Sequence, residues 1–155
     1  MLRNTVCFPF ALSAEDIAAD HCPLHGATIK AFIGATVQNG ILTLSFSDVS
    51  SIEAGKPYLV KWDESENGDN ITDPFFRCVT IDNTLREVTA DGVTFSGSFS
   101  PVSLTANDKT KLFLGPDNQL YYPTSDLTIN SCRGYFQLTG INLGAVSSFV
   151  METGE

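Results

Sequence analysis

An acidic segment in the middle of the chain carries the best candidate ligands for a metal ion. Its oxygen-bearing side chains alternate along the chain, at Asp63, Ser65, Asn67 and Asp69. Alternating oxygen ligands with a glycine for the sharp turn, here Gly68, form the first half of a calcium-binding loop. The second half is missing, because Pro74 stands where a bidentate glutamate is required. We therefore expect no cofactor, and the alternative is calcium held by these four residues.

A second group of metal-ligating side chains lies near the N-terminus, where His21, Cys22 and His25 follow one another closely. Imidazole and thiolate groups bind zinc, but a zinc site usually needs a fourth ligand. In addition, Pro23 prevents the three side chains from sharing one helical face. We interpret this cluster as the exposed end of a helix with two surface histidines.

Aromatic side chains provide the best candidates for ligand binding. Sugar sites on β-domains stack exposed aromatic rings on the apolar face of a pyranose and add hydrogen bonds from amides or carboxylates. Tyr121 and Tyr122 are adjacent in a predicted strand, so one of them must point away from the core. The predicted glycan-binding residues are Trp62, Tyr121, Tyr122 and Asn118. The alternative is that Trp62 belongs to the core, because it is in phase with Tyr58 and Val60.

Catalytic motifs are not found in the sequence, which has no GxSxG, HExxH or GxxxxGK[ST] pattern. Its eighteen acidic residues offer many carboxylate pairs, so a glycosidase-like pair is not excluded by sequence alone. We predict that the protein is not an enzyme.

The charge balance argues against polyanionic partners. The chain has a net charge of −9, and its nine Lys and Arg residues are scattered. Such a surface forms no basic patch for phosphates, so we expect no binding to nucleic acid or to anionic membranes. Membrane spans are not expected either, because no run of about 18 apolar residues occurs.

Composition and turn spacing are typical of an all-β protein. The 155 residues include eleven Phe, twelve Gly and seven Pro; aromatic residues favour strands, whereas Gly and Pro end them. Asn39-Gly40 and Asp91-Gly92 predict tight hairpin turns. One short helix is predicted over 14–21, after a capping residue at Ser13. We predict about nine to eleven short strands in an antiparallel β-sandwich, Greek-key or jelly-roll-like in topology.

Alternating apolar residues locate the strands. They predict a strand over 75–81, directly after the acidic segment, a hairpin over 112–122 and a last edge strand over 149–151. The predicted core consists of Val6, Phe8, Ile29, Leu42, Leu44, Phe46, Tyr58, Val60, Trp62, Val79, Ile81, Val93, Phe95, Phe99, Leu112, Leu114, Tyr121, Ile129, Phe136 and Leu138.

The four cysteines are widely spaced and include no CxxC pair; they are Cys7, Cys22, Cys78 and Cys132. Four cysteines allow three disulfide pairings, and spacing does not choose among them. The strand-like surroundings of most of them favour buried free thiols, with a structural disulfide as the alternative.

Several segments, in this order, carry a family resemblance. The chain resembles the uncharacterised C-terminal β-domains of secreted and surface proteins from gut and oral Bacteroidetes, which often follow leucine-rich-repeat or Ig-like modules. The segments that carry it are 4–10 (NTVCFPF), 54–62 (AGKPYLVKW), 95–101 (FSGSFSP), 111–115 (KLFLG), 120–123 (LYYP) and 129–138 (INSCRGYFQL). The resemblance implies export and a place at the cell surface, and it implies no catalytic residues.

Together these features predict a single β-sandwich domain over residues 1–155, cut from a larger exported protein or forming its C-terminal module, with the export signal upstream. The expected function is that of a non-enzymatic extracytoplasmic accessory, structural or adhesion module. The alternative is a carbohydrate-binding module that uses exposed aromatics. The expected partner is a glycan or a host or surface protein, and the oligomeric state is left open.

Overall fold

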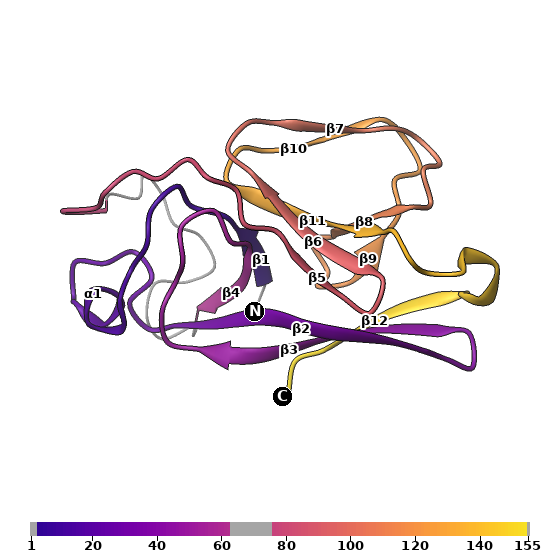
Figure 1. The fold of residues 1–155 in the computed structure, drawn as a ribbon, viewed down its shortest axis with the longest axis horizontal. Helices are drawn as coiled ribbons and strands as arrows, with labels where there is room; N and C mark the ends of the chain where they lie inside the picture. Colours follow the sequence, from indigo (N-terminus) through magenta and orange to yellow (C-terminus); the bar gives the residue numbers. More distant parts are fainter. Residues whose placement is uncertain (1–2, 63–75, 155) are drawn as a thin grey trace.

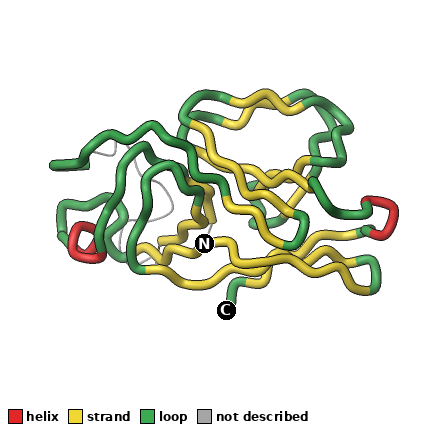
Figure 2. The backbone as a smooth tube through the Cα atoms, in the orientation of Figure 1, coloured by secondary structure: helices red, strands yellow, loops and turns green. Residues whose placement is uncertain are grey.

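The computed structural model describes residues 3–62 and 76–154, and in these ranges the chain is mostly β-structure (Figures 1 and 2). The described strands form two five-stranded sheets and one two-stranded sheet. The first sheet has the order β1 (Arg3–Val6), β4 (Tyr58–Trp62), β2 (Ala27–Gln38), β3 (Ile41–Val49), β12 (Ser148–Glu152). The second has the order β5 (Val88–Ala90), β6 (Val93–Ser98), β11 (Arg133–Leu138), β8 (Lys111–Leu114), β9 (Leu120–Tyr121). The predicted all-β class is confirmed.

The remaining elements are short. Strands β7 (Val102–Leu104) and β10 (Leu127–Ile129) form the two-stranded sheet, and a 3-10 turn, η1 (Leu143–Ala145), precedes β12. Within the described ranges, no helix is long and apolar enough to cross a membrane.

Two-residue turns set the register of the tightest hairpins. Asn39 and Gly40 join β2 to β3 with φ angles of 53° and 79°, and Asp91 and Gly92 join β5 to β6 with φ angles of 52° and 83°. Positive φ at both central residues is the backbone of a type I′ turn, which Asn, Asp and Gly adopt most readily. Both predicted turns are confirmed.

The first sheet is curled, so that its two edges approach each other. In a flat sheet, β1 and β12 would lie four strand spacings apart, roughly 19 Å. Instead, Nη2 of Arg3 on β1 donates to the hydroxyl of Thr153, directly after β12, at 3.1 Å. The buried ammonium of Lys30 on β2 donates to the Thr153 carbonyl at 2.7 Å and pairs with Asp48 on β3. The end of β12 is thereby held against both β1 and β2.

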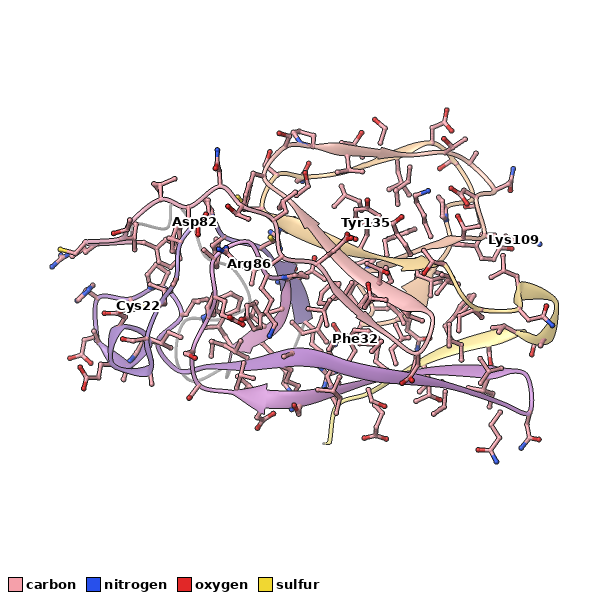
Figure 3. All side chains as sticks on the ribbon, viewed as in Figure 1. Cys22, Phe32, Asp82, Arg86, Lys109 and Tyr135 are labelled. Atoms are coloured by element: carbon pink, nitrogen blue, oxygen red, sulfur yellow. The ribbon has the colours of Figure 1, made fainter. Side chains whose placement is uncertain are left out.

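Four phenylalanine rings join the two large sheets. Phe32 and Phe46 come from the first sheet, and Phe95 and Phe136 from the second. Phe95 and Phe136 stack at 4.3 Å between ring centroids, and Phe32 meets both rings edge-on at 6.4 and 6.1 Å. Figure 3 shows Phe32 between the sheets. All four rings are buried. The part of the β2–β3 hairpin between Phe32 and Phe46, which includes the turn, therefore packs on the β6–β11 pair.

A second core surrounds the short helix α1 (Ala14–Ala18). Ser13 and Asp16 form a capping box, because the Ser13 hydroxyl accepts from the Asp16 N–H and the Asp16 carboxylate accepts from the Ser13 N–H. The helix is shorter than predicted, since Ala19 already has extended backbone angles. Ile17 is buried with Leu12, Leu24 and Trp62.

The predicted strand over 75–81 is wrong for the residues that are described. From residue 76 to Glu87 the chain pairs with no strand of the described structure. Its backbone instead crosses other loops, because the N–H of Asp82 donates to the Pro9 carbonyl and the N–H of Arg86 to the Gly55 carbonyl. An ion pair between Asp82 and Arg86, 2.9 Å long, fixes this crossing (Figure 3).

Two residues predicted in the core lie at the surface. Ile81 is 65% exposed, because the segment that carries it pairs with no strand among the described residues. Tyr121 is 43% exposed, because it ends the two-residue strand β9 at the edge of the second sheet, where its neighbour Leu120 takes the inward position.

The phenylalanine cluster predicts a large response to a single truncation. We expect Phe136→Ala to lower the free energy of unfolding by about 3–5 kcal/mol, because it removes a fully buried ring from the contact between the sheets. Leu85→Ala, at a half-exposed position, is expected to change it by less than about 0.5 kcal/mol. Urea titration of both variants checks this, and similar losses would contradict it.

Candidate functional site

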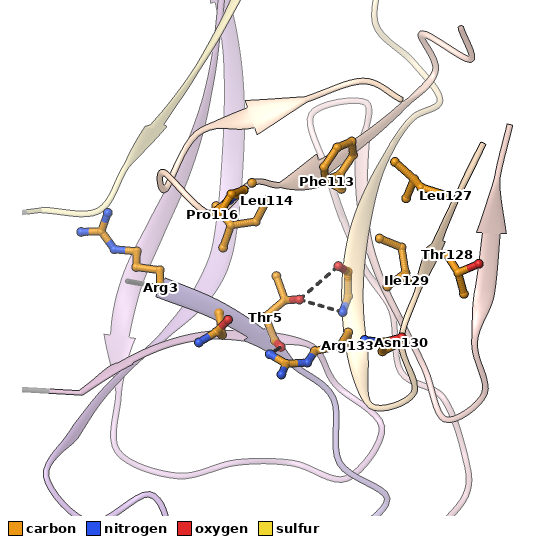
Figure 4. A pocket seen from close by; sticks show the side chains of 13 residues that line it. Arg3, Thr5, Phe113, Leu114, Pro116, Leu127, Thr128, Ile129, Asn130 and Arg133 are labelled. Carbon is orange, nitrogen blue, oxygen red and sulfur yellow. Dashed lines mark hydrogen bonds between the residues drawn. The ribbon is translucent and has the colours of Figure 1, made fainter. Parts of the chain in front are cut away.

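A cavity of about 460 Å³ opens where β1, β8, β10 and β11 meet (Figure 4). Its volume falls within the roughly 300–1,000 Å³ that is typical of small-ligand pockets. The wall consists of Arg3, Asn4, Thr5, Phe113, Leu114, Gly115, Pro116, Leu127, Thr128, Ile129, Asn130, Arg133 and Gly134. Residues far apart in sequence are therefore brought together by the way β1 lies along β11.

The base of the cavity is a contact between these two strands, which we call the β1–β11 junction and define as Thr5, Cys7, Cys132, Arg133 and Gly134. The Thr5 hydroxyl accepts from the Gly134 N–H at 3.0 Å and donates to the Gly134 carbonyl at 3.2 Å (Figure 4). Nη1 of Arg133 donates to the Thr5 carbonyl at 3.2 Å, and the Cys7 N–H donates to the Cys132 carbonyl at 2.8 Å. Side chains thus satisfy backbone groups that a regular ladder would pair.

Two glycines that face each other across β6 and β11 make room for this junction. A Cβ on Gly97 would lie 2.3 Å from the Cys7 sulfur, and a Cβ on Gly134 would lie 2.8 Å from a ring carbon of Phe95. Real Cβ atoms do not approach other atoms so closely. The missing side chain at Gly97 therefore lets Cys7, directly after β1, pack against the second sheet, and the missing side chain at Gly134 leaves room for the Phe95 ring within that sheet.

The charged side chains among the described lining residues are both positive. Arg3 and Arg133 contribute guanidinium groups, and within the described part of the chain no Asp or Glu lines the cavity. Arg133 lies at the base beside Thr5, whereas Arg3 lies at the rim (Figure 4). These two guanidinium groups form a local positive charge in a protein of net charge −9.

The opposite wall is apolar. Phe113 and Leu114 come from β8, Pro116 from the turn after it, and Leu127 and Ile129 from β10. Asn4, Thr128 and Asn130 add further polar side chains to the lining. Such a site can bind a molecule that carries an anionic group next to an apolar face.

The turn between β8 and β9 is tied to β1 at the rim. Asn118, with φ of 63°, accepts the backbone N–H of Arg3 on its side-chain oxygen at 2.7 Å. In the same turn, the Tyr121 hydroxyl donates to the Asp117 carboxylate, which raises the pKa of Tyr121 and lowers that of Asp117. These contacts hold Pro116 in place along the cavity wall.

The predicted glycan-binding residues do not form one aromatic surface. Trp62 is 4% exposed, and its indole N–H donates to the Pro23 carbonyl at 3.0 Å, so its ring packs in the core around α1. Tyr122 is half-buried, with the Lys109 ammonium 5.5 Å from its ring centroid. Tyr121 and Asn118 lie close to the cavity, but neither lines it. The core alternative for Trp62 is the one that the structure supports.

Of the two groups of candidate metal ligands, the structure describes one. Asp63, Ser65, Asn67 and Asp69 lie outside the described residues. Cys22 is buried in the core, while the His25 ring contacts the Ala18 carbonyl at 3.0 Å. Among the residues that the structure describes, no three His, Cys, Asp or Glu side chains are placed to share a metal ion.

Comparisons with protein-family models, with curated proteins and with solved structures find no match to this chain.

Sequence reasoning did not select Arg3, Thr5 or Arg133. The sequence does contain one indication. Arg133 begins a strand in which Phe136 and Leu138 are buried, and a charged side chain in such a strand usually has a hydrogen-bonding partner or a binding role. Thr5 and Gly134 are 129 residues apart in the sequence, so no local sequence pattern predicts their hydrogen bond.

The role of the Thr5 hydroxyl can be tested by comparing the stability of two variants at this position. We expect Thr5→Val to lower the free energy of unfolding by about 1–3 kcal/mol, because the buried N–H of Gly134 loses its acceptor. Thr5→Ser keeps the hydroxyl and loses one methyl group, which costs about 0.8 kcal/mol. Urea titrations of both variants check this, and it is contradicted if Val is tolerated as well as Ser.

The turn before β8 predicts a pH dependence. Hydrogen bonds from the Thr110 hydroxyl, the Lys111 ammonium and the Thr110 N–H lower the pKa of Asp108 from 3.8 to about 2. A lowered carboxyl pKa stabilises the fold above pH 3.8, and this stability is lost as pH falls toward 2. We expect Asp108→Asn to be less stable than the parent by about 1 kcal/mol or less at neutral pH, since the group is near the surface. The difference should vanish in thermal unfolding at pH 2, and its persistence there would contradict the assignment.

Proposed function

We propose that this protein is a non-enzymatic binding module of an exported bacterial surface protein, and that it takes its ligand in the cavity above the β1–β11 junction. The observation that carries the proposal is the Arg133 guanidinium at the base of a cavity whose described lining residues carry positive charge and no carboxylate. These described lining residues also include no His or Cys, so the support is for a binding role over a catalytic one.

The ligand that fits this wall best is a sugar that carries a carboxylate, such as a uronic or sialic acid. A guanidinium pairs with a carboxylate through two parallel hydrogen bonds, and this is the strong type of charge-assisted contact. The ring of Phe113 and the side chains of Leu127 and Ile129 face the cavity from the other side, as an apolar sugar face requires. Asn4 and Asn130 supply amides for sugar hydroxyls.

The fold is consistent with a display role. We infer a β-sandwich from the two five-stranded sheets and the phenylalanine cluster between them. Export, a place at the cell surface and a part in adhesion to a glycan or to a host protein rest on the resemblance in sequence. In this proposal, the cavity is the part of the surface that contacts the partner.

The test is binding of glucuronic acid and N-acetylneuraminic acid oligosaccharides to the purified chain, with their neutral counterparts as controls, in the presence and absence of calcium. We expect binding of the acidic sugars alone. Arg133→Met should weaken it roughly 10- to 100-fold, because it removes a charge-assisted hydrogen-bond donor. Arg133→Lys should give a smaller loss, since lysine keeps the charge but not the two-pronged geometry.

The matched control is Arg77→Met, which removes an exposed arginine that does not line this cavity. Because Arg133 also bonds Thr5, each variant is first compared by urea titration, and affinity is measured where all are folded. Equal binding by the Arg133→Met and Arg77→Met variants would overturn the site. Binding of neutral and acidic sugars alike would overturn the ligand class.

A further inference from the structure

Cys7 and Cys132 meet at the β1–β11 junction. Cys7 directly follows β1, Cys132 directly precedes β11, and the N–H of the first donates to the carbonyl of the second at 2.8 Å. Because one hydrogen bond and three covalent bonds separate the two Cα atoms, these lie at most about 7 Å apart, and bond angles shorten this further. Disulfides join Cα atoms about 4.4–6.8 Å apart. The spacing of the two backbones is therefore compatible with a disulfide.

The two thiols differ in burial and in their charged surroundings. Cys7 is fully buried, and its sulfur packs above Gly97, where a side chain would collide with it. Burial, together with the negative charge of Cys132, raises the pKa of Cys7 to about 11. Cys132 is partly exposed, and the adjacent Arg133 opposes the effect of burial on its pKa.

The other two cysteines lie elsewhere. Cys22 is buried in the core around α1, at the far end of the molecule from Tyr135 on β11 (Figure 3). Cys78 is exposed, on the segment from residue 76 to Glu87, which pairs with no strand in residues 3–62 and 76–154. The structure thus distinguishes among the three pairings that spacing left open.

We propose that Cys7 and Cys132 form a thiol pair that closes to an intramolecular disulfide and locks the β1–β11 junction. Both are free thiols in this structure, so closure needs an oxidant, which a small-molecule disulfide such as oxidised glutathione supplies. This inference does not depend on the ligand proposed above.

The exchange proceeds in two steps. The accessible Cys132 thiolate attacks one sulfur of oxidised glutathione, the glutathione S–S bond breaks, and one glutathione thiolate leaves. Cys7 then loses its proton to solvent and attacks the Cys132 sulfur, the mixed disulfide breaks, and the second glutathione leaves. The protein loses two protons and two electrons, and one oxidised glutathione becomes two reduced thiols.

The disulfide would lie directly beneath the cavity, because Cys132 adjoins Arg133 and Cys7 lies two residues after Thr5. It would replace contacts that can open with a covalent link across most of the chain. A link that closes so long a loop restricts the unfolded chain strongly, so the oxidised protein should melt roughly 5–15 °C above the reduced one.

The experiment treats the full chain with oxidised glutathione, quenches it in acid, alkylates the remaining thiols and maps the peptides by mass spectrometry. The expected result is a linked peptide pair containing Cys7 and Cys132, two hydrogen atoms lighter than the reduced pair, and a raised Tm. The double variant Cys22→Ser/Cys78→Ser is the control, and it should form the same link with the same rise in Tm.

Two single variants separate the steps. Cys7→Ser should stop at a glutathione adduct on Cys132, because the resolving thiol is missing. Cys132→Ser should leave Cys7 unmodified while the protein is folded, because Cys7 is not accessible. The proposal is overturned if the oxidised parent links other cysteines, if it forms no Cys7–Cys132 link, or if that link leaves the Tm unchanged.

Discussion

The contact of β1 with β11 is the constraint on which the rest of the structure depends. β1 belongs to the first sheet through its ladder with β4, and its other edge faces the second sheet. On that edge, the Arg133 guanidinium satisfies the Thr5 carbonyl and the Cys132 carbonyl satisfies the Cys7 N–H, while the Thr5 hydroxyl satisfies the backbone of Gly134 on β11. Buried backbone groups without partners are costly, so these side chains determine whether the two sheets can meet at this angle at all.

The candidate site is a direct result of the same contact. Because β1 joins β11 through side chains and not through a full ladder, space remains between β1, β8 and β10, and Arg133 lies at its base. Gly97 and Gly134 have no room for a side chain on either side of this contact. Arg133 both lines the cavity and bonds the Thr5 carbonyl, so under the proposed function a change at Arg133 would act on both stability and ligand affinity.

Local chemistry predicted local structure well. Asn39-Gly40 and Asp91-Gly92 adopt the turns that their tolerance of positive φ allows, and the phase of Trp62 with Tyr58 marks it as a core residue. The segment after residue 76 misled prediction, since apolar alternation there is not matched by a neighbouring strand. The cavity could not be predicted from the sequence for a related reason. Thr5 and Gly134 meet only because the two sheets pack together, and the residue pattern within either strand does not predict that contact.

The curl of the first sheet has a topological consequence. Its outermost strands, β1 and β12, are the first and the last of the described chain, yet Arg3 and Thr153 are joined by a hydrogen bond of 3.1 Å. The two ends of the fold lie side by side, as Figure 1 shows. A domain with adjacent ends can be inserted into a loop of another protein, or circularly permuted through a short linker, without stretching its sheets. Both ends of the described chain therefore lie on the same side of the fold.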